Sequence, residues 1–150
     1  IEVESEKSSG TIFNVYIPAY EPASLDSSSP SDKIILLADD EIMLRDLLAE
    51  LLESNGYNVI KVPSSTEVLK VLTEEIKVDL VIIDYNMPGG MNGLDCVAKI
   101  RELNMEMPII LSTGSLAFDE DFDVNKMGIS NMLPKPYEFD TMLSTIRKLI

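Results

Sequence analysis

The feature that most constrains the fold is the repeated alternation of short apolar runs with helical patterns between residues 33 and 150. The continuous apolar run at 33–38 is typical of a strand buried on both faces, and further strands are predicted at 79–84 and 108–113. Short strands at 57–62 and 129–133 bring the number to five, and the apolarity of 79–84 predicts that it is the central one. Five strands alternating with helices predict an α/β fold, with a parallel sheet covered by helices on both faces.

The predicted helices carry apolar stripes together with start and stop signals. A helix over 41–55 has leucines at helical spacing, namely Leu44, Leu47, Leu48, Leu51 and Leu52. Asn55-Gly56 ends it, and a capping box at Ser64–Glu67 opens the next helix, which runs to about residue 75. Further helices are predicted over 91–103, burying Leu94, Val97 and Ile100; over 117–127, with few apolar residues; and over 137–150, burying Phe139, Met142, Leu143, Ile146 and Leu149.

Residues 1–32 differ in pattern from the rest of the chain. Alternating runs at Ile1–Glu4 and Thr11–Ile17 flank a polar turn, which predicts a β-hairpin within residues 1–20. Residues 21–32 are rich in Ser and Pro and predict a linker. The expected organisation is therefore a hairpin over 1–20, a linker over 21–32 and one domain over 33–150.

Composition excludes several classes of function. The net charge of −14 repels phosphate backbones, so nucleic acid is not an expected ligand. The sequence has no histidine, which excludes histidine triads, His-ligated zinc and a phosphohistidine formed on this chain. The single cysteine, Cys96, excludes an internal disulfide and fits a reducing compartment. No apolar run approaches the ~20 residues of a membrane span, so no membrane contact is expected. Because the chain starts at Ile1, we expect it to belong to a longer protein.

Polar residues that carry chemistry follow the predicted strands at the carboxyl edge of the sheet, where ligands bind in folds of this class. Asp39 and Asp40 follow the first strand, Asp84 ends the third, Thr113 ends the fourth and Lys135 follows the fifth. Clustered carboxylates raise one another's pKa unless a cation intervenes, and hard oxygen ligands suit Mg²⁺. The pattern predicts a metal-assisted site in which a carboxylate attacks a phosphoryl group and Lys135 neutralises charge.

Each of these residues also has an ordinary structural role. An Asp after a buried strand often forms a turn or caps a helix, Glu41 suits the first turn of a helix, and Cys96 suits a core position. The acidic run at 119–123 is typical of a solvated face. The convergence of acid, hydroxyl and ammonium groups on one sheet edge favours a functional site.

These residues resemble the receiver domain of two-component signalling over essentially all of 33–150. The matching segments are LADDE at 37–41, VIIDYNMP at 81–88, Gly93-Leu94, PIILSTG at 108–114 and PKP at 134–136. The resemblance implies a doubly wound, flavodoxin-like sheet of five parallel strands in the spatial order 2-1-3-4-5, within a single domain that carries an N-terminal hairpin extension.

The resemblance also implies roles for individual residues. Asp84 would accept the phosphoryl group and bind Mg²⁺, Asp40 would ligate Mg²⁺ directly, and Asp39 would hold it through water. The backbone carbonyl of Asn86 would be the remaining protein ligand.

Two further residues would act on the phosphoryl group. Thr113, which directly precedes the small residue Gly114, would supply the switch hydroxyl, and Lys135 would contact the phosphoryl group. The family usually has an aromatic residue three positions before this lysine, where this chain has Met132, so we expect a softer switch. The pair Gly89-Gly90 lengthens the following loop and predicts mobility there.

The N-terminal segment resembles the last hairpin of a histidine-kinase ATPase domain, through IEVES at 1–5, GTIF at 10–13 and VYIP at 15–18. A hybrid histidine kinase whose ATP-binding boxes are absent from this sequence is the expected parent. This fragment would then catalyse at most its own phosphorylation and dephosphorylation. The expected location is cytoplasmic, with any membrane anchor in a part that precedes this sequence.

The expected partner is a histidine kinase or a histidine phosphotransfer protein. A dimer through the face formed by 117–127, 129–133 and 137–150 is a further expectation. The alternative function is a receiver-shaped interaction module that signals without phosphorylation. An Mg²⁺-dependent aspartyl phosphatase of another family fits less well, because it needs an acid two residues after the nucleophile, where Asn86 stands.

Overall fold

The described part of the chain contains two separate sheets. The computed structural model describes residues 2–6, 10–14, 32–74, 76–87, 90–103, 105–114, 123–124 and 126–150. Five parallel strands form the larger sheet in the order β4-β3-β5-β6-β7: β3 (Ile34–Ala38), β4 (Asn58–Val62), β5 (Leu80–Asp84), β6 (Ile109–Thr113) and β7 (Asn131–Pro134). Counted without the hairpin strands, this is the predicted order 2-1-3-4-5, with the 79–84 run at the centre.

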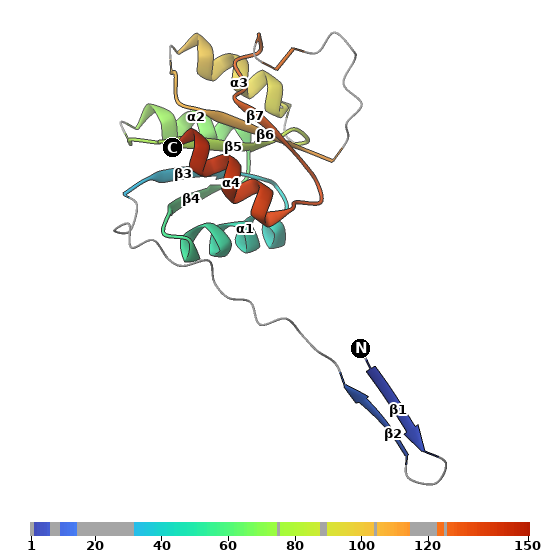
Figure 1. The fold of residues 1–150 in the computed structure, drawn as a ribbon. Coiled ribbons are helices and arrows are strands. Elements are labelled where there is room, and N and C mark those ends of the chain that lie inside the picture. Colours follow the sequence, from blue (N-terminus) through green and yellow to red (C-terminus); the bar gives the residue numbers. More distant parts are fainter. Residues whose placement is uncertain are drawn as a thin grey trace.

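Two described helices cover each face of the sheet (Figure 1). The helices α1 (Ile42–Ser54) and α4 (Phe139–Leu149) pack on one face, and α2 (Ser65–Thr73) and α3 (Gly93–Glu102) pack on the other. All five residues of β5 and all five of β6 are buried. This explains their continuous apolar sequences, because a central strand has no solvated face.

Most predicted helix boundaries are confirmed by the local geometry. The side chain of Ser64 accepts a hydrogen bond from the Glu67 amide, as a capping box requires. Asn55 caps the end of α1, and Gly56 follows with a φ of 89°, which glycine adopts without strain. Glu41 is the N-cap residue of α1 and lies just before the first turn in which we expected it.

One leucine of the predicted apolar stripe is exposed, and one prediction of burial is wrong. Leu47 is 51% exposed, because the buried face of α1 is centred on Leu48, Ala49 and Leu52, and Leu47 projects away from it. Phe139 is 40% exposed, because it is the first residue of α4, at the point where the helix leaves the loop after β7. The other core residues predicted in α4 are buried or half-buried.

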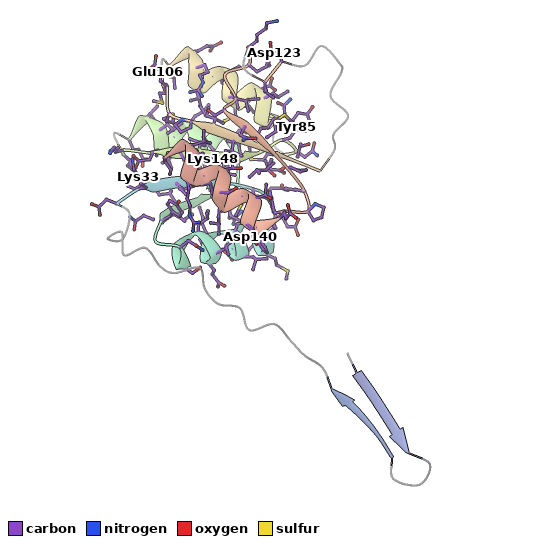
Figure 2. The ribbon with its side chains drawn as sticks, in the orientation of Figure 1. Lys33, Tyr85, Glu106, Asp123, Asp140 and Lys148 are labelled. Atoms are coloured by element: carbon purple, nitrogen blue, oxygen red, sulfur yellow. The ribbon has the colours of Figure 1, made fainter. Side chains whose placement is uncertain are left out.

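The amino edge of the sheet is held by a buried carboxylate. Asp79 accepts hydrogen bonds from the Ile34 amide at 3.0 Å and from Lys33 Nζ at 3.2 Å. Lys77 Nζ lies 3.4 Å from the same carboxylate. In Figure 2, Lys33 and Tyr85 mark opposite ends of the sheet, because Lys33 precedes β3 and Tyr85 follows β5.

The N-terminal hairpin prediction is confirmed for the backbone. Strands β1 (Glu2–Glu6) and β2 (Gly10–Asn14) pair antiparallel, with Glu4 opposite Ile12. The linker prediction lies outside the described residues except for its last residue. The helix predicted over 117–127 also lies largely outside them, and the described residues near its end form a turn with a hydrogen bond from the Met127 amide to the Asp123 carbonyl.

Candidate functional site

The predicted site residues gather at the carboxyl edge of the sheet because all five strands run parallel. Asp39 follows β3 directly, Asp84 ends β5 and Thr113 ends β6. All three are buried, with exposed fractions of 4% or less. Lys135 follows β7, and its backbone amide donates to the Thr113 carbonyl at 2.8 Å. In Figure 2 the site therefore lies at the end of the sheet where Tyr85 is labelled.

Lys135 joins two of the carboxylates. Its Nζ lies 2.8 Å from Asp39 Oδ2 and 3.0 Å from Asp84 Oδ1. The second oxygen of Asp39 accepts from the Glu41 amide at 2.9 Å, which fixes the orientation of that carboxylate. Arg45 Nη1 donates to the Asp39 backbone carbonyl at 2.6 Å and ties the start of α1 to the same loop. The structure thus brings together the acids and the lysine that the sequence predicted.

Three acids form a cluster of the kind that binds Mg²⁺. Asp39, Asp40 and Asp84 each offer a carboxylate oxygen, and these oxygens lie within 4.8 Å of one another. Asp40 is exposed while the other two are buried, so the cluster opens to solvent on one side. Hard oxygen donors with an open side fit Mg²⁺, which usually retains several waters. Asn86, the fourth predicted ligand, is also exposed, in the loop after β5.

The electrostatics of the pocket follow from burial and from these contacts. Burial raises the pKa of Asp84 above its usual value, and the charges of Asp39 and Asp40 raise it further, against the opposing effect of Lys135. Burial alone would lower the pKa of Lys135, but its hydrogen bond to Asp39 and the charge of Asp84 outweigh burial and raise it. Lys135 is therefore a permanent cation between two buried carboxylates.

The backbone around Asp84 is held by close packing of the following helix. Gly93 begins α3, and a Cβ atom at this position would lie 2.5 Å from the Asp84 carbonyl oxygen. Its amide donates to the Tyr85 carbonyl at 3.0 Å. The loop between them is also tied to α2, because Ser65 Oγ donates to the Met91 carbonyl at 3.0 Å. Gly90 in this loop has a φ of 91°, and residues 88–89, part of the predicted mobile segment, lie outside the described residues.

One feature of the pocket was missed by sequence reasoning. Ser112 Oγ and Tyr137 Oη lie 2.5 Å apart, within hydrogen-bond distance. Ser112 is in register with Asp84 on the neighbouring strand, and Tyr137 follows Lys135 by two positions. Side chains alternate in direction along β6, so Ser112 and Thr113 point to opposite faces of the sheet. This alternation is the sequence signal that could have found the pair.

A parallel sheet that holds an acidic cluster and a lysine at its carboxyl edge defines a class of α/β domains suited to binding a divalent cation and a phosphoryl group. The model of the response regulator receiver domain family matches residues 35–147. The chain belongs to this family. Its function is that of a receiver domain of two-component signalling, with a phosphoacceptor role, and its acidic cluster is consistent with an Mg²⁺ site.

Relatives and solved structures agree with this assignment. The transcriptional regulatory protein GlrR of Escherichia coli K12 is 36% identical over 112 residues, which cover 75% of this chain and 25% of GlrR. The transcriptional regulatory protein CpxR of the same strain is 33% identical over 116 residues, covering 77% of this chain and 48% of CpxR. The chain thus matches about a quarter to a half of these relatives' length.

Among solved structures, the response regulator TrrA of Thermotoga maritima, in complex with Mg(2+)-BeF, aligns with a TM-score of 0.70 and 32% identity, over 79% of this chain and 99% of that chain. A receiver domain protein of Clostridium thermocellum aligns with a TM-score of 0.72 and 32% identity, over 79% and 94% of the two chains. These alignments confirm the predicted receiver fold.

Proposed function

We propose that Asp84 is the phosphoacceptor of this receiver domain and that it takes the phosphoryl group from a phosphohistidine on a partner protein. The observation that carries the proposal is the contact of Lys135 with Asp84 inside the acidic cluster. A carboxylate oxygen of Asp84 attacks phosphorus, the phosphorus–nitrogen bond to the histidine breaks, and the phosphorus–oxygen bond of an acyl phosphate forms. The partner is a histidine kinase or a histidine phosphotransfer protein.

The pocket residues supply what this transfer needs. Asp39, Asp40, Asp84 and the Asn86 carbonyl are the groups that would hold Mg²⁺, which when bound neutralises negative charge on the phosphoryl oxygens. Lys135 places a second positive charge beside Asp84. Phosphorylation adds about −1.5 to −2 charge, so the pocket needs both cations.

The surface beside the pocket is suited to a helical partner. Ile42, Met43 and Leu47 on α1 are 64%, 83% and 51% exposed. This helix begins two residues after Asp40, so the apolar patch lies next to the open side of the acidic cluster. We propose that the histidine-bearing partner packs on these side chains when it delivers the phosphoryl group.

The output of the domain is proposed to depend on Thr113. After phosphorylation its hydroxyl donates to a phosphoryl oxygen, and the space that it leaves is filled by Met132 on β7, which is half-buried against the core. Because methionine has no single fixed rotamer, the face formed by β7 and α4 shifts gradually. Dimerisation through this face is part of the same proposal.

The wider context of the chain is also a proposal. We propose that the antiparallel pair β1–β2 is the last hairpin of a histidine-kinase ATPase domain, that 21–32 is a linker, and that 33–150 is the receiver of a cytoplasmic hybrid histidine kinase. The sequence resemblance at 1–18 supports this origin. Among the described residues, no helix is both long enough and apolar enough to cross a membrane.

The phosphoacceptor is tested by mass spectrometry of the full chain after incubation with acetyl phosphate and Mg²⁺. We expect a gain of one phosphoryl group that disappears in Asp84→Asn and persists in Asp140→Asn, an exposed aspartate in the first turn of α4. No gain in the wild-type chain would favour the alternative, an interaction module that signals without phosphorylation. Gain in Asp84→Asn equal to that of the wild type would assign the phosphoacceptor elsewhere.

A further inference from the structure

The hydroxyl pair of Ser112 and Tyr137 lies beside the lysine–carboxylate cluster. Ser112 and Asp84 are register partners on adjacent parallel strands, so their side chains leave the sheet on the same face. Ser112 is 1% exposed, and its Oγ lies 2.5 Å from the Oη of half-buried Tyr137. The tyrosine hydroxyl is therefore held at the strand position next to the proposed phosphoacceptor.

The tyrosine ring also contacts the lysine that pairs with Asp84. Lys135 Nζ lies 5.9 Å from the centroid of the Tyr137 ring, within the range of a cation–π interaction, which extends to about 6 Å. The same Nζ contacts Asp39 and Asp84. The ammonium group is thus bounded by two carboxylates and by one aromatic ring.

The electrostatics of Tyr137 agree with this placement. Burial raises the pKa of Tyr137 to about 12, and the charges of Asp39 and Asp84 raise it further, whereas Ser112 and Lys135 act in the opposite direction. The phenol is therefore un-ionised at neutral pH and keeps its proton for a hydrogen bond. The two carboxylates that contact Lys135 therefore also act on the tyrosine hydroxyl.

We infer that Tyr137 is a positioning residue that holds the Lys135 ammonium beside Asp84 during phosphoryl transfer, with Ser112 fixing the tyrosine ring in place. The inference rests on the proposed role of Asp84. A lysine has a flexible four-carbon stem and carries a compact charge. Restricting that stem before the reaction means that no ordering is needed when negative charge develops on the phosphoryl oxygens. In this role Tyr137 and Ser112 act through Lys135 rather than on the reacting atoms.

Three variants of the full chain separate the ring from its hydroxyl anchor. Tyr137→Phe removes the hydroxyl group and keeps the ring, Ser112→Ala removes the partner hydroxyl, and Tyr137→Leu removes the ring. Tyr57→Phe is the matched control, because Tyr57 is a half-buried tyrosine that packs against the same core cluster, away from the site residues in the sequence. The measurements are the rate constant of phosphorylation by acetyl phosphate at saturating Mg²⁺, the Kd for Mg²⁺ and Tm.

The expected pattern is a split between the rate and metal binding. Tyr137→Phe and Ser112→Ala each slow phosphorylation about three- to tenfold, which is the effect of losing one hydrogen bond that orders a group. A double variant that combines Ser112→Ala with Tyr137→Phe is no slower than either single variant, since both substitutions remove the same bond. Tyr137→Leu is slower still, and Tyr57→Phe phosphorylates at the wild-type rate. The Kd for Mg²⁺ stays within about twofold, because none of the substitutions removes a carboxylate of the acidic cluster.

Rates measured well below Tm are unaffected by a purely structural loss, so they distinguish positioning from packing. Wild-type rates in all three variants, with lowered Tm, would overturn the inference and leave the phosphoacceptor proposal standing. A parallel loss of Mg²⁺ affinity would also overturn it, because the pair would then act on the carboxylates. No uptake of phosphoryl by the wild-type chain would overturn the proposed function and this inference together.

Discussion

Replacing Asp84 by asparagine should stabilise the metal-free protein. The oxygens of Asp39, Asp40 and Asp84 lie within 4.8 Å of one another, and two unit charges at 4.8 Å repel by about 3.5 kcal/mol at an effective dielectric constant of about 20. Lys135 at 3.0 Å from Asp84 attracts it by about 5.5 kcal/mol on the same scale. Water screens part of the repulsion by exposed Asp40, so the charges nearly cancel.

The desolvation of Asp84 then decides the sign. Asp84 is only 4% exposed, and burial is the largest cause of the raised pKa of its carboxyl group. Asparagine carries no charge to desolvate and can still accept a hydrogen bond from Lys135. We expect Asp84→Asn to stabilise the metal-free chain by about 1 to 2 kcal/mol, which corresponds to a rise in Tm of about 2 to 8 °C for a chain of this length.

The dependence of folding stability on pH and on Mg²⁺ provides two independent checks of this prediction. Because the pKa of Asp84 is raised by folding, the folded state binds the proton more tightly than the unfolded state. The stability of the metal-free wild type should therefore fall as the pH rises from 3.8 through the raised pKa, and the variant should lack this fall. Mg²⁺ at ten times its Kd should stabilise the wild type by about 1.4 kcal/mol and the variant by less.

The assay is thermal unfolding followed by circular dichroism, with EDTA or with Mg²⁺. Asp32→Asn is the control, since it removes one negative charge at an exposed position outside the pocket. It should leave the response to Mg²⁺ unchanged. A lower Tm for metal-free Asp84→Asn, or an equal gain from Mg²⁺ in the wild type and in this variant, would refute the account of the pocket.

Three further predictions concern the surroundings of the site. Gly93→Ala should destabilise the chain by about 2 kcal/mol, because the new Cβ would clash with the Asp84 carbonyl. Gly114→Ala should destabilise it much less, because a Cβ at that position meets nothing within 4 Å. Similar losses of Tm in the two variants would contradict this prediction. The Ile34 amide and the nearby lysines lower the pKa of Asp79. The contribution of this carboxylate to stability is therefore present above pH 3.8 and is lost as the pH falls through the lowered pKa. In a plot of Tm against pH, Asp79→Asn should show a smaller fall of Tm on the acid side than the wild type. Deletion of residues 1–32 should leave the phosphorylation rate unchanged, and a truncated chain that does not fold would place the domain boundary elsewhere.

The strand predictions succeeded because burial in a central parallel strand leaves a local signal. Residues of β5 and β6 are buried on both sides, so an apolar run identifies them without knowledge of their neighbours. The candidate site was predictable for a related reason. Parallel strands bring their carboxyl ends to one edge, so Asp39, Asp84 and Lys135 had to converge once the topology was known.

Burial at the margins of helices was less predictable, because helical periodicity gives a stripe but not its exact centre. The leucines of α1 form a wide stripe, and the sheet covers only the part around Leu48 and Leu52, which leaves Leu47 exposed. Phe139 has the spacing of a core residue but lies at the first position of α4. Both exposures arise because the orientation of a helix axis relative to the sheet is set by packing rather than by local sequence.

By itself, the sequence determined the class of fold, the order of its elements and the edge of the sheet that carries the acids. The tertiary structure decided which groups touch. The contact of Lys135 with Asp39 joins residues 96 positions apart, and the contact of Ser112 with Tyr137 depends on how the loop after β7 folds back toward β6. Local patterns encode periodicity and burial, whereas a distance of 2.8 Å between two charged atoms depends on the packing of every element between them.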